Sequence, residues 1–158
     1  MTMTGLDFMR EAIRLSREGS LAGKGGPFGA VVVKDGAIVG RGCNEVLATN
    51  DPTAHAEIVA IRDAAKALGS FHLTGCEIYT TCEPCPMCLG AIYWAKIEKI
   101  VYANTRADAA RIGFQDEFLY EELGLPPADR KLETTQFLRK EALAVLDEWL
   151  TMESRRLY

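Results

Sequence analysis

The sequence predicts an α/β protein built as a three-layer α/β/α sandwich with a mixed central sheet. Two observations predict this fold class. β-branched segments flank the pair Asp35-Gly36, which is the strongest short signal for an antiparallel hairpin. Further along, a helical pattern separates two strand-like segments and predicts a right-handed crossover with parallel strands. A sheet with both kinds of pairing needs helices on both faces.

Length and composition predict a single domain over residues 1–158. The chain has 48% hydrophobic and 25% charged residues and a net charge of −4. It has no run of about 20 apolar residues that could span a bilayer, and its first residues lack a basic leader and an apolar block. We therefore expect a cytoplasmic protein. Its acidic balance and scattered Lys and Arg residues disfavour a nucleic-acid partner.

The first helix is predicted from hydrophobic periodicity, and the connector that follows it is predicted from its glycines. Apolar residues at helical spacing predict an amphipathic helix over 6–19. The glycine-rich segment 23–29 lacks the Lys-Ser/Thr ending of a phosphate-binding loop, so it is interpreted as a connector into a strand. The two hairpin strands are expected over 28–34 and 37–42.

A second helix is expected over 52–68. Asp51 is a preferred N-cap, and Pro52 suits the first helical position because its missing N–H would have no partner there. The face packed on the sheet is expected to consist of Ala54, Ile58, Ile61, Ala65 and Leu68.

The remaining pattern predicts a strand over 76–81, a helix over 84–95 and a strand over 97–103. Residues 121–136 are polar and contain proline, and they could act as a hinge. Helical spacing resumes over 137–152. No internal repeat is visible.

Cysteine spacing predicts a metal site. The chain has five cysteines, an odd number, which in a reducing compartment favours metal binding over disulfides. Cys85 and Cys88 are spaced i, i+3 at a helix start and so face the same way. His55, at the start of another helix, can supply a third ligand, and helix N-termini favour thiolate over thiol. One Zn²⁺ ion per subunit is the expected cofactor.

The charge of this ligand set predicts a catalytic site. Zinc with two thiolates and one neutral imidazole is neutral overall and leaves a position for a water or hydroxide. Glu57, two residues after His55, points to another side of its helix and is expected to carry that water's proton. Alternatively, Cys82 could complete a structural Cys₃His site without water. Pro84 and the strand end at Cys82 argue against that alternative.

The H-x-E and P-C-x-x-C pairing is the signature of zinc deaminases. On these residues the chain resembles the cytidine deaminase superfamily and, within it, the short bacterial guanine deaminases. The likeness covers most of the chain and is carried by GGPFGAVVVKDG (25–36), NDPTAHAE (50–57), TTCEPCPMCLGAIYWA (80–95), DAARIGFQD (108–116) and the terminal Tyr158. The metal motifs identify only the superfamily, whereas PFGAVVVKDG, IYWA and GF-x-D point to guanine deaminases.

The resemblance implies that His55, Cys85 and Cys88 are the zinc ligands and Glu57 is the proton shuttle. Cys82 is not a ligand in that family. The implied fold is the cytidine deaminase-like sandwich.

The resemblance also implies a substrate pocket of Phe28, Asn44, Asp116 and Tyr158, with Trp94 close by. Phe28 can stack on a purine, and Asn44 offers a donor and an acceptor to a ring edge. Asp116 can accept from the N–H groups of guanine or assist proton transfer. Composition alone would equally allow Phe28 as a core residue and Asp116 as a solvated loop acid.

The implied activity is hydrolytic deamination of guanine to xanthine and ammonia, in purine catabolism or salvage. The family further implies a homodimer in which segment 137–158 crosses to close the partner's site, although docking on its own subunit is an alternative. Gln115 stands where the family motif has an acidic residue. Alternative functions are deamination of tRNA adenosine or of another small aminoheterocycle, and a structural-zinc interaction module.

Overall fold

The computed structural model describes residues 3–158. The elements follow in the order α1 (Gly5–Leu21), β1 (Gly29–Lys34), β2 (Ala37–Cys43), α2 (Val46–Thr49), α3 (Ala56–Leu68), β3 (Cys76–Cys82), α4 (Pro86–Trp94), β4 (Lys99–Asn104), α5 (Arg106–Arg111), α6 (Glu117–Leu123), η1 (Pro127–Asp129) and α7 (Arg139–Thr151). The chain divides into two compact units, one ending at Asp116 and the other spanning Glu117–Tyr158.

The first unit contains a four-stranded mixed sheet in the order β2-β1-β3-β4. Strand β1 pairs antiparallel with both β2 and β3, whereas β3 and β4 are parallel. Asp35 and Gly36 have φ angles of 49° and 76°, as a tight turn of the I′ class requires. The predicted hairpin, crossover and mixed sheet are all confirmed.

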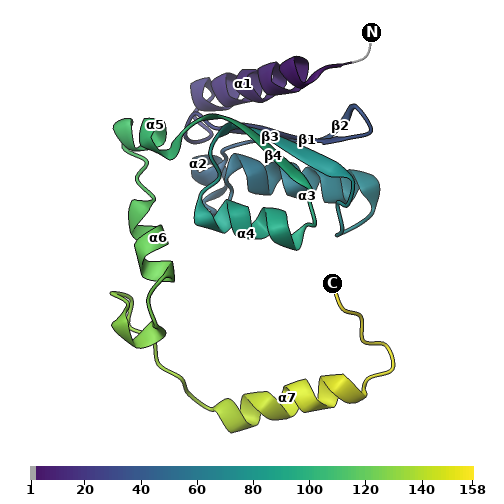
Figure 1. Cartoon of the computed structure of the whole chain (residues 1–158), viewed down its shortest axis with the longest axis vertical. Coiled ribbons are helices and arrows are strands. Elements are labelled where there is room, and N and C mark those ends of the chain that lie inside the picture. The colour runs from purple at the N-terminus through teal and green to yellow at the C-terminus, as the bar shows by residue number, and fades with distance from the viewer. Residues whose placement is uncertain (1–2) are drawn as a thin grey trace. The chain divides into compact units, whose positions relative to one another are not determined.

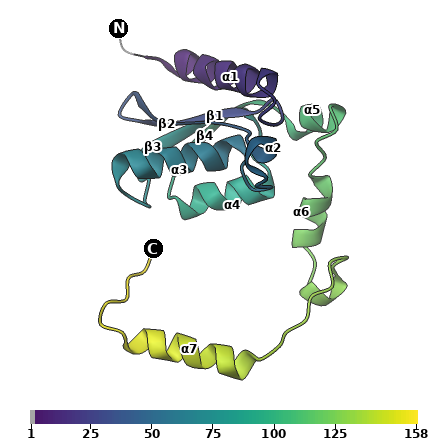
Figure 2. The same ribbon diagram turned by 180° about the vertical axis from the view of Figure 1, so that it is seen from behind.

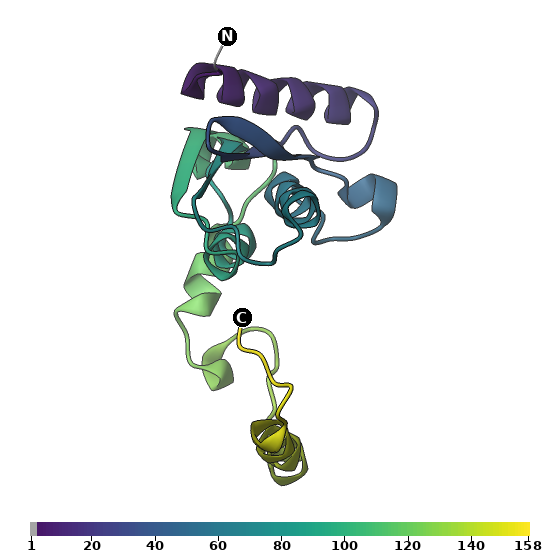
Figure 3. The same cartoon turned by 90° about the vertical axis from the view of Figure 1, so that its right-hand side faces the viewer.

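Helices cover both faces of this sheet, as the three-layer prediction requires. Figures 1 and 2 show α1 on one face and α3 and α4 together on the other. Figure 3 shows α3 and α4 nearly end-on, with the purple α1 across the sheet from them. Under α1, the core consists of Phe8, Val31, Val33 and Tyr79. On the other face it consists of Ala30, Val32, Ala56, Ala60, Ala64, Leu73, Cys76, Ile78, Ile92, Ala95 and Ile97.

Helix α3 lies unusually close to the sheet because β2 presents glycines to it. A Cβ at Gly42 would lie 2.2 Å from the Ala56 carbonyl oxygen, and one at Gly40 would lie 2.4 Å from that of Ala60. An alanine stripe therefore makes the closest contact with the sheet, while the predicted Ile61, Ala65 and Leu68 pack beside it, partly buried. This close approach fixes the first turn of α3 against the sheet.

The predicted start of α3 is wrong by four residues, since the helix begins at Ala56 and not at Pro52. The Asp51 carboxylate accepts from the backbone N–H and the hydroxyl of Thr53, at 2.8 and 2.6 Å. Asp51 therefore closes a local side-chain turn and does not cap a helix. The correction places His55 at the N-cap position of α3.

The segment after β4 is more helical than the sequence suggested. Helices α5, α6 and η1 lie where no helix was predicted, because each is too short to show a helical period. Helix α5 starts with a capping box between Thr105 and Asp108. Helix α7 lies within the predicted range 137–152.

No residue of the unit Glu117–Tyr158 is buried, and four large apolar residues of α7 are exposed: Leu143, Val145, Leu146 and Leu150. Among residues 3–158, no helix is both long enough and apolar enough to cross a bilayer.

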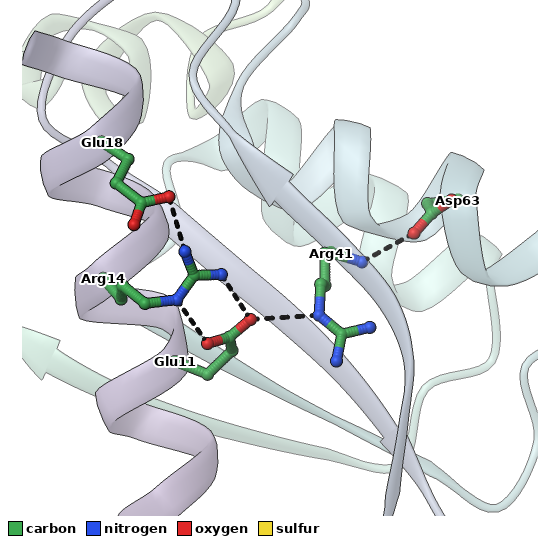
Figure 4. Close-up of polar contacts among 5 residues, drawn as sticks. All are labelled: Glu11, Arg14, Glu18, Arg41 and Asp63. Carbon is green, nitrogen blue, oxygen red and sulfur yellow. Dashed lines mark hydrogen bonds and ion pairs between the residues drawn. The ribbon is translucent and has the colours of Figure 1, made fainter. Parts of the chain in front are cut away.

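A polar network joins α1, β2 and α3 at the edge of the sheet (Figure 4). The Glu11 carboxylate accepts from Arg14 at 2.8 Å and from Arg41 Nε at 3.1 Å. The backbone N–H of Arg41 donates to Asp63 on α3 at 2.9 Å. Hydrogen bonds from Arg14 and then Arg41 lower the pKa of Glu11 to about 2.

Replacing Glu11 with Gln is expected to destabilise the fold by about 1 kcal/mol or less at neutral pH, since both arginines are half-exposed. The pKa of Glu11 is lower in the folded chain than its ordinary value of 4.5. Its contribution is therefore complete above that value and is lost as the pH falls toward about 2. Urea unfolding of both proteins between pH 7 and 3 should show the difference shrinking below pH 4.5. If the difference in unfolding free energy between the two proteins did not change with pH, a lowered pKa of Glu11 could not be its source.

Candidate metal centre and active site

Three side chains from two helix starts form a compact cluster. His55 is the N-cap residue of α3, Cys85 is the N-cap residue of α4, and Cys88 lies in the first turn of α4. Their ligand atoms all lie within 4.8 Å of one another, and Cys88 is buried. The three predicted metal ligands are therefore brought together.

The cluster has the dimensions of a zinc site. His55 Nδ1 lies 3.6 Å from Cys85 Sγ and 3.5 Å from Cys88 Sγ. Zinc–sulfur bonds of about 2.3 Å and a zinc–nitrogen bond of about 2.0 Å, meeting at tetrahedral angles, place sulfur and nitrogen about 3.5 Å apart. The donor set and its spacing therefore both fit zinc.

The local electrostatics favour a thiolate at Cys85. Hydrogen bonds from Cys88 and His55 lower the pKa of Cys85 to about 4, against the opposing effect of burial. The backbone N–H groups at the start of α4 also favour a negative charge there. A hydrogen bond to the Cys85 sulfur, together with burial, raises the pKa of Cys88.

Glu57 lies beside the cluster in the first turn of α3. Its side chain is buried, with Oε2 at 3.4 Å from Cys88 Sγ. Its other oxygen, Oε1, accepts from the Thr80 hydroxyl at 3.2 Å. Burial raises the pKa of Glu57. A buried carboxylate that borders a metal site can carry protons there.

Cys82 does not join the ligand set that the structure brings together. Its Sγ lies 3.6 Å from the Thr105 carbonyl oxygen, and burial raises its pKa to about 11. Within residues 3–158, the cluster spaced for a metal contains His55, Cys85 and Cys88 without Cys82. This arrangement leaves a coordination position for water and disfavours the structural Cys₃His alternative.

Two of the predicted substrate contacts lie next to the start of α3. The Asn44 backbone N–H donates to the Phe28 carbonyl at 3.0 Å, which ties the two residues together. The next residue, Glu45, donates its backbone N–H to the Ala54 carbonyl at 2.9 Å, directly before His55. Asn44 is buried, and Phe28 is partly buried against the core.

The other predicted contacts are more scattered. Asp116 is half-buried at the end of the first unit, where burial, with a contribution from the charge of Cys85, raises its pKa. Trp94 ends α4, while Cys85 caps its start, so about 13 Å of helix separates them. Within one chain Trp94 lies apart from the cluster, and Tyr158 ends the second unit. Their roles stay predictions.

Sequence reasoning missed two residues near the site. The Phe114 ring packs edge-on against Phe28, with 5.0 Å between ring centroids. Phe114 lies within the motif DAARIGFQD, so this motif could have indicated it as a residue near the site. Thr80 contacts Glu57, but a threonine in a strand carries no signal of its own because threonine favours strands generally.

Comparison with known proteins agrees with this geometry. Residues 3–104 match the family described as the cytidine and deoxycytidylate deaminase zinc-binding region. Guanine deaminase of Bacillus subtilis (strain 168) is 49% identical over 151 residues, which are 96% of this chain and 97% of that protein. A tRNA-specific adenosine deaminase of Aquifex aeolicus is 42% identical over 95 residues, 60% of each chain.

Among solved structures, an X-ray structure of guanine deaminase from Bacillus subtilis superposes with a TM-score of 0.95 and 48% identity. The match covers 99% of both chains. It confirms the predicted deaminase-like fold, and the zinc-binding family confirms the predicted cofactor. The chain belongs to the cytidine and deoxycytidylate deaminase zinc-binding family.

Proposed function

We propose that this protein deaminates guanine by hydrolysis at its C2 amino group, giving xanthine and ammonia. One observation carries the reaction class: the buried Glu57 carboxylate lies 3.4 Å from Cys88 in a cluster with zinc dimensions. The relative named guanine deaminase supports the choice of substrate, because its similarity extends along nearly the whole chain.

The chain's own residues handle the protons of this reaction. His55, Cys85 and Cys88 would hold a zinc ion, which when bound would act as a Lewis acid and lower the pKa of a water molecule. Glu57 takes one proton from this water as its oxygen bonds to C2 and delivers that proton to the ring nitrogen N3. Glu57 then passes the second water proton to the amino group as the C2–N bond breaks. The water oxygen becomes the C2 carbonyl oxygen, so every atom of guanine and water is found in the products, xanthine and ammonia.

We further propose that the predicted pocket residues bind the purine. Phe28 stacks on the ring, and Asp116 accepts from the guanine N–H groups. Asn44 Oδ1 already accepts from the Val46 backbone N–H at 3.2 Å, which leaves its NH₂ group to donate to the purine. Trp94 and Tyr158 complete the pocket in the assembled protein.

We also propose that the protein is a cytoplasmic homodimer that exchanges its C-terminal segment. The exposed apolar side chains of this segment support docking on another surface, and they include Leu143, Val145, Leu146 and Leu150. A reducing compartment is supported by the cysteines, none of which forms a disulfide: Cys43, Cys76, Cys82, Cys85 and Cys88.

Deleting Tyr158 is expected to leave a folded, zinc-loaded protein with weakened guanine turnover. The aromatic ring of a lid excludes water and strengthens the electrostatics around the metal. Steady-state kinetics should show a lower kcat/KM for the deletion, whereas Tyr158→Phe should retain most of the activity. Unchanged kinetics in the deletion would remove Tyr158 from the pocket.

The substrate is tested by ammonia release from zinc-loaded protein offered guanine, adenine, cytosine, cytidine and a tRNA anticodon stem-loop in parallel. The proposal predicts turnover of guanine. Activity confined to the RNA would instead favour the relation to the tRNA-specific adenosine deaminase, which matches 60% of this chain.

A further inference from the structure

We propose that Thr80 positions Glu57 for proton transfer by holding its Oε1 oxygen, so that the Oε2 oxygen faces the metal cluster. This inference rests on the proposed function, because it assigns a role within the same reaction. Thr80 is a positioning residue in this account, since it acts through Glu57.

Thr80 is rigidly placed at the centre of the sheet. It lies on β3, is 1% exposed, and pairs in register with Ala30 on one side and Tyr102 on the other. Side chains of a strand alternate between faces, and Ile78, two residues earlier, belongs to the core on the α3 face. The Thr80 hydroxyl is therefore fixed on the face that carries Glu57.

The two Glu57 oxygens have different partners. Oε1 accepts from the Thr80 hydroxyl at 3.2 Å, and Oε2 lies 3.4 Å from Cys88 Sγ. A carboxylate in a buried site loses water as a partner, so a fixed donor on one oxygen determines where the other oxygen points. The contact with Thr80 thus orients the oxygen that carries the proton.

The Thr80 hydroxyl has a second acceptor within reach. Its oxygen also lies 3.2 Å from the Cys82 carbonyl oxygen. A hydroxyl has one proton to donate, so Glu57 Oε1 and the Cys82 carbonyl compete for it. Because the transferred proton is carried on Oε2, Oε1 stays an acceptor throughout the reaction and can keep the Thr80 hydroxyl as its donor.

Thr81 offers a matched control on the same strand. It is also buried, but its side chain points to the α1 face, where its hydroxyl accepts from the Gly29 backbone N–H at 3.0 Å. Replacing Thr81 with Val removes another buried threonine hydrogen bond without touching Glu57.

A double-mutant cycle in metal-free protein tests the contact without relying on activity. Thr80→Val and Glu57→Ala, made singly and together, are compared by urea unfolding at one protein concentration. We expect non-additivity of about fivefold or more in the unfolding equilibrium constant. Thr81→Val combined with Glu57→Ala should be additive. Additivity for Thr80 as well would overturn the inference, because its hydroxyl would then serve only the Cys82 carbonyl.

Kinetics of the zinc-loaded protein test the consequence of the contact. Thr80→Val is expected to lower kcat by about 10- to 100-fold, the effect of one hydrogen bond to a charged group, while KM and bound zinc stay near wild-type values. Thr80→Ser, which keeps the hydroxyl, should restore most of kcat. A wild-type protein inactive on guanine would contradict the proposed function, and the cycle would still report on the contact. An active wild type with an unchanged Thr80→Val kcat would overturn the positioning role.

Discussion

Replacing Glu57 with Gln is expected to lower guanine turnover by about 10³-fold or more while leaving zinc bound. The amide keeps the size of the side chain and an oxygen that accepts from Thr80, but it cannot take a proton from water and deliver it to the purine. Zinc stays because Glu57 lies outside the three-residue cluster. Parallel measurement of kcat and metal content checks both parts of this expectation.

Glu77→Gln is a suitable comparison because Glu77 lies on β3, the strand of Thr80, and contacts Tyr79 and Lys99. It is not part of the metal cluster. Its kcat should stay near that of the wild type. Near-native turnover in Glu57→Gln would remove Glu57 from the mechanism, and loss of zinc would make Glu57 a ligand.

Replacing Cys85 with Ala is expected to abolish both zinc binding and activity. The change removes one of three protein ligands, and loss of even an outer partner of a metal ligand costs about 10- to 100-fold in affinity. We therefore expect a loss of zinc affinity of at least about 100-fold. Competition with a chromophoric chelator measures it directly.

Cys82→Ala is the matched variant for this experiment, since Cys82 lies three residues away and contacts the Thr105 carbonyl. It should bind zinc as tightly as the wild type. If Cys82→Ala lost zinc as Cys85→Ala does, the site would be the closed structural type and the catalytic interpretation would fail.

Local signals predicted most of the first unit. The Asp35-Gly36 turn specifies its own backbone conformation, and the order of strand, helix and strand specifies a parallel crossover. The start of α3 could not be predicted, because Asp51 suits a helix cap and a local turn equally well and the neighbouring Thr53 decides between them. Short helices such as α5 and α6 have too few residues for a periodic pattern.

The two cysteines of the metal cluster, like the hairpin, could be predicted because the residues concerned are close together in the sequence. The spacing of Cys85 and Cys88 fixes their relative orientation within one helix turn. The contact between Thr80 and Glu57 joins residues 23 positions apart through the packing of α3 on the sheet, and no local pattern encodes it. The edge-on contact of Phe114 with Phe28 depends on the tertiary fold in the same way.

Zinc titration into metal-free protein, with guanine deamination followed at each addition, tests the central claim most directly. The account predicts that activity rises in proportion to added zinc and reaches its maximum at one ion per chain, held by His55, Cys85 and Cys88. Full guanine turnover without zinc, or a fully loaded protein that does not deaminate guanine, would contradict it.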